Sequence, residues 1–288
     1  MAIQSRCMRN IKLTVAYDGT DFRGWQIQPG QPTVQGLLTE TLQQLTQLPV
    51  VLHGAGRTDA GVHAWGQVAS FSTQSDLSPG DFARGLNALL PPAIRIRDAE
   101  EAGPDFHARW QSEAKTYIYR VYRGRVVPPF HWRYVLHEYG PLDFAAMHAA
   151  AHTFVGDHDF TSFAASSGSD EIDQDRLTRR TIYQSEMLAC GQASASAPAG
   201  LLPNDLPWPL PGPDEWVYAV RGKSFLRHMV RKMMGALLEV GRGRLQPSDI
   251  PRIIELRDRA QSGPTVPPQG LCLASVEYPD PTGAKALL

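Results

Sequence analysis

One stretch of twelve residues, from His53 to Ala64, constrains the fold of this chain more than any other. It reads His-Gly-Ala-Gly-Arg-Thr-Asp-Ala-Gly-Val-His-Ala and lies between two apolar runs. Glycine tolerates positive φ and lets another segment approach the backbone closely. The stretch is therefore predicted to be a tight loop that presents Asp59, two residues after Arg57, as a candidate reacting carboxylate. The plainer alternative is a turn in which Asp59 only caps the backbone.

Two common phosphate-binding loops do not fit this stretch. A P-loop ends in Gly-Lys followed by Ser or Thr, and the stretch has no such ending. A dinucleotide-binding fingerprint that begins at Gly54 and Gly56 needs a third glycine at position 59, where Asp59 stands. The loop is thus not expected to bind ATP or NAD.

Periodicity along the 288 residues predicts a mixture of strands and helices in two domains. Strands are expected over 11–17, 50–53, 67–72, 94–98, 115–122, 181–188, 215–220 and 271–278, and helices over 33–47, 81–90, 143–154, 225–240 and 249–258. This irregular order favours an α+β fold with mixed, largely antiparallel sheets flanked by helices. We place the boundary after residue 104, so that domain 1–104 carries the Asp59 loop and domain 105–288 the remaining elements.

Three features of the second domain stand out. The helix over 225–240 carries a basic face and is expected to stop at Gly241. Residues 191–213 contain six prolines, which cannot sit in a strand ladder, and are predicted to form an extended insertion. Residues 166–175 form a second polar loop, which is acidic.

The composition gives no sign of export or of a membrane span. No apolar run approaches the roughly 18 residues that a span needs, and the first ten residues lack the apolar core of a secretory signal. The three cysteines are widely spaced and odd in number, which argues against a disulfide framework and a zinc ribbon. We therefore expect a cytoplasmic protein with no membrane partner.

The net charge is only −1, but the charges are unevenly distributed. Residues 221–244 hold seven cationic side chains against one acidic one, and residues 107–134 hold six against one. Such segments are typical of a surface that faces a polyanion. A solvated face with scattered acidic partners explains the charge equally well.

Three kinds of function are compatible with these residues. His148 and His152 have the helical spacing of metal ligands, but residues 148–152 read His-Ala-Ala-Ala-His without the acid of a metalloprotease motif, so no metal site is predicted. A non-catalytic RNA-binding protein would use the basic segments for phosphates and their aromatic residues for stacking. An RNA-modifying enzyme would apply Asp59 to a base held by those aromatics. The aromatics in question are Trp110, Tyr117, Tyr119, Tyr122 and Trp132.

Six motifs, in the same order along the chain, resemble those of the bacterial tRNA pseudouridine synthase A family. They lie at 18–26, 54–64, 105–110, 154–163, 228–231 and 270–271, and the block Gly-Arg-Thr-Asp-Ala-Gly-Val-His within 54–64 is the most specific. The resemblance implies an isomerase that converts uridine to pseudouridine at positions 38, 39 and 40 of the tRNA anticodon stem-loop, without a cofactor. It also implies two α+β domains with a cleft between them, and a homodimer that binds tRNA.

The resemblance further implies roles for six residues. Asp59 attacks the ribose C1′ or abstracts a ribose proton, and the two roles stay open. Arg231 pairs with Asp59 and favours its charged form. Tyr117 stacks on the target base and helps to remove the C5 proton. The substrate-binding set contains Arg57, Thr58, Tyr117 and Leu271, of which Arg57 enters the RNA stem and Leu271 packs under Tyr117.

Without the resemblance, plainer roles fit the same residues. Arg231 suits a phosphate contact or a solvated helix face, and Arg57 suits an ion pair within the turn. Tyr117 and Leu271 suit an ordinary core.

Overall fold

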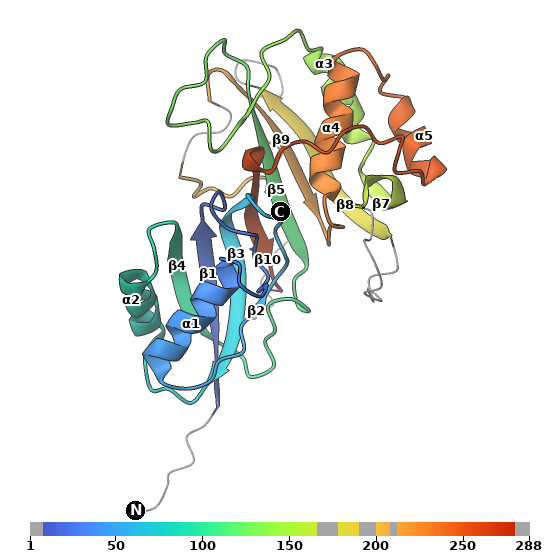
Figure 1. Cartoon of the computed structure of the whole chain (residues 1–288). Helices are drawn as coiled ribbons and strands as arrows, with labels where there is room; N and C mark the ends of the chain where they lie inside the picture. The colour runs from blue at the N-terminus through green and yellow to red at the C-terminus, as the bar shows by residue number, and fades with distance from the viewer. Residues whose placement is uncertain (1–7, 166–177, 190–199, 208–211, 280–288) are drawn as a thin grey trace, which may run out of the picture. The chain divides into compact units, whose positions relative to one another are not determined.

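The computed structural model describes residues 8–165, 178–189, 200–207 and 212–279, which form ten strands and five α-helices (Figure 1). The chain divides into two compact units, one made of residues 1–113 and 275–288 and the other of residues 114–274. The sequence-based boundary after residue 104 differs from this division, in which the chain leaves the first unit after residue 113 and returns to it at residue 275. The predicted α+β class is confirmed.

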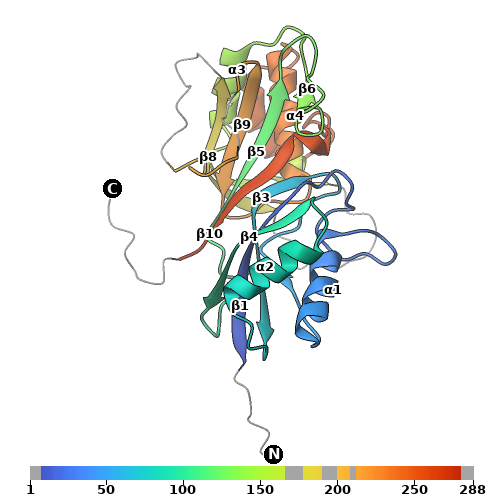
Figure 2. The same cartoon turned by 90° about the vertical axis from the view of Figure 1, so that its left-hand side faces the viewer.

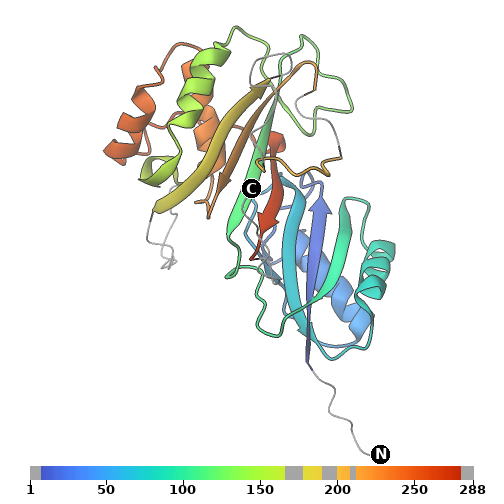
Figure 3. The ribbon, with the colours of Figure 1, turned by 180° about the vertical axis from the view of Figure 1, so that it is seen from behind.

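The first unit is an antiparallel sheet with two helices on one face (Figures 1 and 3). Its central strand β1 pairs with β3 on one side and with β4 on the other, and β2 pairs with β3. Inward residues of β1 alternate along the strand, and Ile11, Leu13 and Val15 are fully buried. The elements are β1 (Arg9–Tyr17), α1 (Val34–Thr46), β2 (His53–Gly54), β3 (His63–Thr73), α2 (Pro79–Leu89) and β4 (Ile94–Ala102).

Local sequence explains where both helices begin. The hydroxyl of Thr33 accepts a hydrogen bond from the backbone N–H of Gly36 at the start of α1. Ser78 and Asp81 form a reciprocal capping box at the start of α2. The helix predictions over 33–47 and 81–90 are confirmed, because these caps agree with the apolar periodicity that follows them.

The second unit has strand order β5–β9–β8–β7, with β6 added in parallel to β5. Helices α3 and α4 lie on one side of its strands (Figure 2). The final strand β10 begins in this unit and ends in the first. The elements are β5 (Ala114–Tyr122), β6 (Leu136–His137), α3 (Phe144–His152), β7 (Gly156–Asp159), β8 (Arg179–Ala189), β9 (Glu215–Gly222), α4 (Met229–Gly241), α5 (Asp249–Leu256) and β10 (Leu271–Glu277).

Three details correct the sequence predictions. The helix expected from residue 225 begins at Met229, because His228 adopts a left-handed conformation with φ of 62°. Helix α4 ends at Gly241, where the sequence predicts its stop, but Gly241 itself has a helical conformation, and the glycine with positive φ is Gly243. An added Cβ at Gly241 would come 2.5 Å from the Met147 sulfur of α3. The strand expected over 50–53 is reduced to His53 and Gly54.

Two predicted loops lie largely outside the described residues. The loop over 166–175 is wholly outside them, and only residues 200–207 and 212–213 of the Pro-rich insertion are described. Cys272 is a buried free thiol. Within the described ranges, no helix combines the length and apolarity required to cross a membrane.

Candidate active site

The Asp59 loop lies between β2 and β3 in the first unit, and neighbouring segments fix its backbone. The Trp25 N–H donates to the carbonyl of Thr58 at 3.1 Å, and the Gly61 N–H donates to the carbonyl of Phe22 at 3.3 Å. The buried hydroxyls of Tyr17 and Thr58 are 2.7 Å apart. Thr58 is thus held on both its carbonyl and its side chain, directly before the carboxylate-bearing residue.

Gly24 allows the segment over 18–26 to lie directly against this loop. Its φ is +88°, and an added Cβ would come 2.6 Å from the carbonyl oxygen of Thr58 and 3.1 Å from the carbonyl carbon of Asp59. Backbone atoms cannot move aside as a flexible side chain can. Position 24 therefore needs glycine both for its conformation and for the close approach.

The far end of the loop is anchored in the same way. The Gly19 N–H donates to Nδ1 of His63 at 3.0 Å, and a Cβ at position 19 would come 1.9 Å from the Val62 carbonyl oxygen. The Asp18 carboxylate lies 3.2 Å from the same His63 nitrogen. Both ends of the predicted loop thus rest on residues 18–25.

The loop leaves its two charged residues in different environments. Asp59 is half-buried, and its carbonyl accepts a hydrogen bond from the Val62 N–H at 3.1 Å, which closes the turn. Arg57 is exposed, and Thr58 is buried. The arrangement matches a carboxylate held on a rigid turn, with an arginine beside it that reaches solvent.

Tyr117 lies in β5 of the second unit, opposite Val220 of β9. Only 7% of its surface is exposed, and its ring meets the Phe225 ring edge-on, with centroids 5.0 Å apart and an interplanar angle of 78°. All nine residues of β5 are buried, so this strand does not show the one-sided burial that its alternating sequence suggests.

Arg231 lies in the first turn of α4 and is tied to the segment before β10. Its Nε–H donates to the Val266 carbonyl at 2.8 Å, and the Val266 N–H lies 3.5 Å from the Arg231 carbonyl. A guanidinium carries five N–H donors in a rigid plane, so one bond at Nε fixes the direction of the whole group.

Leu271 begins β10 and is 5% exposed. The preceding Gly270 lies against the Tyr119 ring, whose hydroxyl donates to the Pro267 carbonyl at 2.8 Å. Burial raises the pKa of Tyr119 far above its usual value, and the positive charge of Arg231 only partly offsets this effect. The Tyr119 hydroxyl therefore stays protonated as a structural donor.

The predicted site residues form two groups, each described within its own unit. Arg57, Thr58 and Asp59 share the loop of the first unit, while Tyr117, Arg231 and Leu271 belong to β5, α4 and β10 of the second. The pairing of Asp59 with Arg231 joins the two groups and stays a prediction.

Several of the cations counted in the basic segments serve the fold. Arg120 is 8% exposed and forms a buried bidentate pair with Glu215, with N···O distances of 2.7 and 3.2 Å. Lys232 donates to the Ser162 and Arg259 carbonyls and the Ser262 hydroxyl, and burial lowers its pKa. Charge counting therefore overestimated the cationic side chains available to a polyanion.

The aromatic residues proposed for stacking differ in their exposure to solvent. Tyr119 is fully buried, and Tyr117 and Tyr122 are exposed over only 7% and 9% of their surfaces, whereas Trp110 is 79% and Trp132 is 56% exposed. Phe225 was not predicted as a site residue, because the sequence places it at the start of the helix expected over 225–240, whereas it lies in the loop before α4. The sequence analysis also missed the roles of Gly24 and Trp25, although both stand in one of the recognised motifs.

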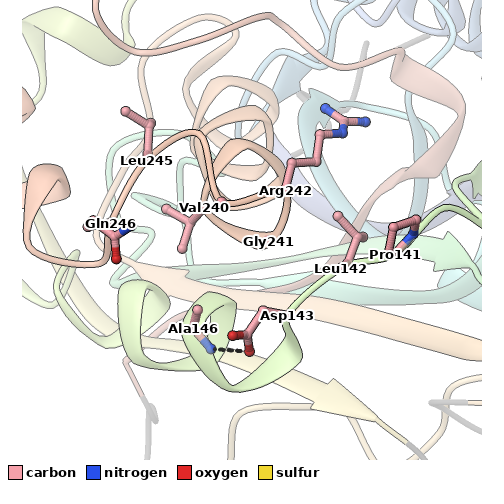
Figure 4. Close-up of a pocket in the computed structure, with 10 residues that line it drawn as sticks. Pro141, Leu142, Asp143, Ala146, Val240, Gly241, Arg242, Leu245 and Gln246 are labelled. Atoms are coloured by element: carbon pink, nitrogen blue, oxygen red, sulfur yellow. Dashed lines mark hydrogen bonds between the residues drawn. The ribbon is translucent and has the colours of Figure 1, made fainter.

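A pocket of the second unit lies elsewhere, between the beginning of α3 and the end of α4 (Figure 4). It is lined on one side by Pro141, Leu142, Asp143 and Ala146, and none of the six predicted site residues lines it. The Asp143 carboxylate accepts the Ala146 N–H at 2.9 Å and so caps α3. Among the described residues, one group could hold a metal ion: His148, His152 and Glu186 on α3 and β8.

Comparison with known proteins gives a consistent result. The family model described as tRNA pseudouridine synthase matches residues 13–111 and 150–279. The tRNA pseudouridine synthase A of Solibacter usitatus is 43% identical over 272 residues, covering 94% of this chain and 100% of that protein. The tRNA pseudouridine synthase A of Solidesulfovibrio magneticus is 41% identical over 281 residues, covering 95% and 93%.

The matched ranges contain the Asp59 loop, together with Arg231 and Leu271, while Tyr117 falls in the gap between them. Matches of this extent separate an enzyme from a non-catalytic RNA-binding protein, and they establish uridine isomerisation in tRNA as the activity. The chain therefore belongs to the tRNA pseudouridine synthase family and is an isomerase that acts on tRNA.

Proposed function

We propose that this isomerase acts on uridines 38, 39 and 40 of the tRNA anticodon stem-loop, with Asp59 as its catalytic carboxylate and without a cofactor. The observation that carries the proposal is the Asp59 loop. The hydrogen bond from the Trp25 N–H to the Thr58 carbonyl and the hydrogen bond between the Tyr17 and Thr58 hydroxyls hold the backbone beside a half-buried carboxylate. Such preorganisation spares the reaction the free-energy cost of positioning the group.

The chemistry needs a carboxylate and no electron carrier. The N1–C1′ bond of uridine breaks, the base turns over, a C5–C1′ bond forms, the C5 hydrogen leaves as a proton, and N1 takes up a proton. No electrons are gained or lost. Asp59 attacks C1′ as a nucleophile or removes a ribose proton as a base, and both roles require its ionised form.

The other predicted residues support Asp59. Arg231 pairs with the carboxylate, and the bond from its Nε–H to the Val266 carbonyl restrains the guanidinium within the second unit. Tyr117 stacks on the target base, and its edge contact with Phe225 holds the ring in place. Leu271 packs beneath Tyr117.

The target base must leave the RNA stem before it can react. Extrusion costs a few kcal/mol of stacking and pairing, and the exposed Arg57 enters the stem to offset that cost together with Thr58. A homodimer, which the family resemblance implies, and a cytoplasmic location, which the composition favours, belong to the same proposal. Sedimentation of the purified protein checks the homodimer.

The test compares wild type with Asp59→Asn in tritium release from tRNA that carries [5-³H]uridine. Isomerisation must expel the C5 hydrogen, so the assay follows the reaction itself. We expect release by wild type, none by Asp59→Asn, and tRNA affinities within a few-fold of each other. Sequencing of the product should place pseudouridine at positions 38 to 40.

A matched control removes the same charge elsewhere in the first unit. Asp98 is exposed on β4 and lies outside the six family motifs, and Asp98→Asn should release tritium at the wild-type rate. Residual turnover in Asp59→Asn, combined with a large loss of tRNA affinity, would show that Asp59 binds substrate and does not carry the chemistry.

A further inference from the structure

Two histidines of α3 and one glutamate of β8 converge on the surface of the second unit. His148 and His152 are one helical turn apart and so share a face of α3. Glu186 comes from β8, against which α3 packs (Figure 2). The sequence motif lacked a carboxylate, and the fold brings one to the histidines from a strand more than thirty residues away.

The distances between the three side chains suit a small cation. Nε2 of His152 lies 3.1 Å from Nε2 of His148 and 3.2 Å from Oε2 of Glu186. The ligand atoms of the three residues all lie within 4.8 Å of one another. Zinc bonds of about 2.0–2.1 Å in a tetrahedron place ligand atoms about 3.3–3.4 Å apart. Two of the three separations are thus already close to the tetrahedral value.

The surroundings of His148 prepare it as a ligand. Its Nδ1 lies 3.1 Å from the Met187 carbonyl, which can only accept, so the ring proton sits on Nδ1 and Nε2 presents a lone pair. Metal-binding histidines are typically oriented by such a bond from the other ring nitrogen. The Phe144 ring, stacked at 6.0 Å and 17°, holds the imidazole plane.

With the His148 proton on Nδ1, hydrogen bonds alone do not satisfy the three side chains of the cluster. His152 Nε2 faces the lone pair of His148 Nε2 and a carboxylate oxygen of Glu186 together. A single N–H cannot point fully at both. A cation among the three atoms would instead be favourable to every one of them.

We propose that His148, His152 and Glu186 bind a divalent transition-metal ion, with Zn²⁺ as the best match to two imidazole nitrogens and a carboxylate oxygen. Water completes the coordination, since the His152 side chain is 48% exposed. The ion joins α3 to β8. It takes no part in the isomerisation, because neither element carries a residue proposed for catalysis.

The experiment uses the full-length protein after treatment with a chelator that is then removed. Titration calorimetry with ZnCl₂ should show one equivalent bound, and Co²⁺ should give the visible absorption of a tetrahedral site. His152→Gln and Glu186→Gln should each weaken Zn²⁺ binding about 10–100-fold. His158→Gln is the control, because His158 is a histidine of the same unit whose ring bonds the Val155 carbonyl and which does not belong to the cluster of His148, His152 and Glu186.

Three outcomes would overturn the proposal. These are no stoichiometric uptake by wild type, unchanged affinity in both folded variants, or a loss in His158→Gln as large as in His152→Gln. If a variant does not fold by circular dichroism, zinc X-ray absorption of the wild-type protein decides. Two imidazoles with oxygen donors support the site, whereas thiolate or all-oxygen coordination rejects it.

Discussion

At the scale of single residues, Gly24 offers the sharpest test of the Asp59 loop. A Cβ at position 24 would collide with the backbone of Thr58 and Asp59, so Gly24→Ala should displace the carboxylate. A displacement of about 1 Å costs on the order of 100-fold in turnover, and we expect a loss of that size in tritium release. Thermal unfolding should show a folded protein.

The variant Gly30→Ala separates the effect of the steric collision at position 24 from the effect of the left-handed backbone conformation. Gly30 also has positive φ, at +68°, but no atom lies within 4 Å of an added Cβ. Both variants should lose about 1 kcal/mol of stability from the left-handed conformation, yet only Gly24→Ala should lose turnover. Equal turnover in the two variants would contradict the role that we give to the close approach.

Residue by residue, the candidate site was predictable where its chemistry is local. Glycines around a single acid marked the Asp59 loop, the family motifs contain Arg231 and Leu271, and Tyr117 follows from the family resemblance outside those motifs. The contacts that hold these side chains were not predictable. Phe225 meets Tyr117, and the Val266 carbonyl meets Arg231, only because the fold brings distant segments together.

At the scale of elements, a charged cluster secures the end of α4. The Glu239 carboxylate accepts from Arg242 at 2.8 Å and from Arg244 at 3.1 Å, and Arg242 also pairs with Glu138. Burial favours a higher pKa for Glu239, but the hydrogen bonds from the two arginines outweigh it and hold the pKa below its usual value. The cluster therefore stabilises the fold above the unfolded-state pKa and loses this effect as pH falls through the lower folded-state value.

Glu239→Gln should accordingly lower the free energy of unfolding by about 1 kcal/mol near neutral pH, an estimate reduced for the solvent exposure of Arg244. The difference from wild type should shrink at acid pH, as the pH falls through the lowered folded-state pKa of Glu239 and the carboxylate gains its proton. Thermal midpoints at both pH values measure it. Glu255→Gln, on the exposed side of α5, should change neither midpoint. A deficit of equal size at both pH values would contradict the electrostatic origin.

Element boundaries show what periodicity can and cannot predict. Apolar spacing predicted each of the five α-helices found in the described residues, including α4, of which ten of the thirteen residues are buried. It placed the start of α4 four residues early, because Leu226 fits the stripe while His228 turns the backbone out of the helical region. It also suggested a half-exposed β5, whereas every residue of that strand is buried, including Arg120 with its partner Glu215.

At the scale of the whole molecule, the near-neutral net charge does not show which cationic side chains are engaged in the fold and which are exposed. Arg120, Lys232 and Arg242 are engaged inside the fold. Lys223 and Arg227, which come just before α4, are exposed. Because phosphate contacts release condensed counterions, exposed cations of this kind should control the salt dependence of tRNA binding.

Lys223→Gln and Arg227→Gln should each weaken tRNA binding and reduce the slope of log affinity against log salt by about 1. Filter binding over a range of KCl concentrations measures this slope. Arg252→Gln removes an exposed charge of α5, outside both basic segments, and should leave the slope unchanged. Arg120→Gln should instead lower stability, because it leaves Glu215 buried without its partner. If all four variants changed the slope alike, binding would follow total charge rather than the exposed cations before α4.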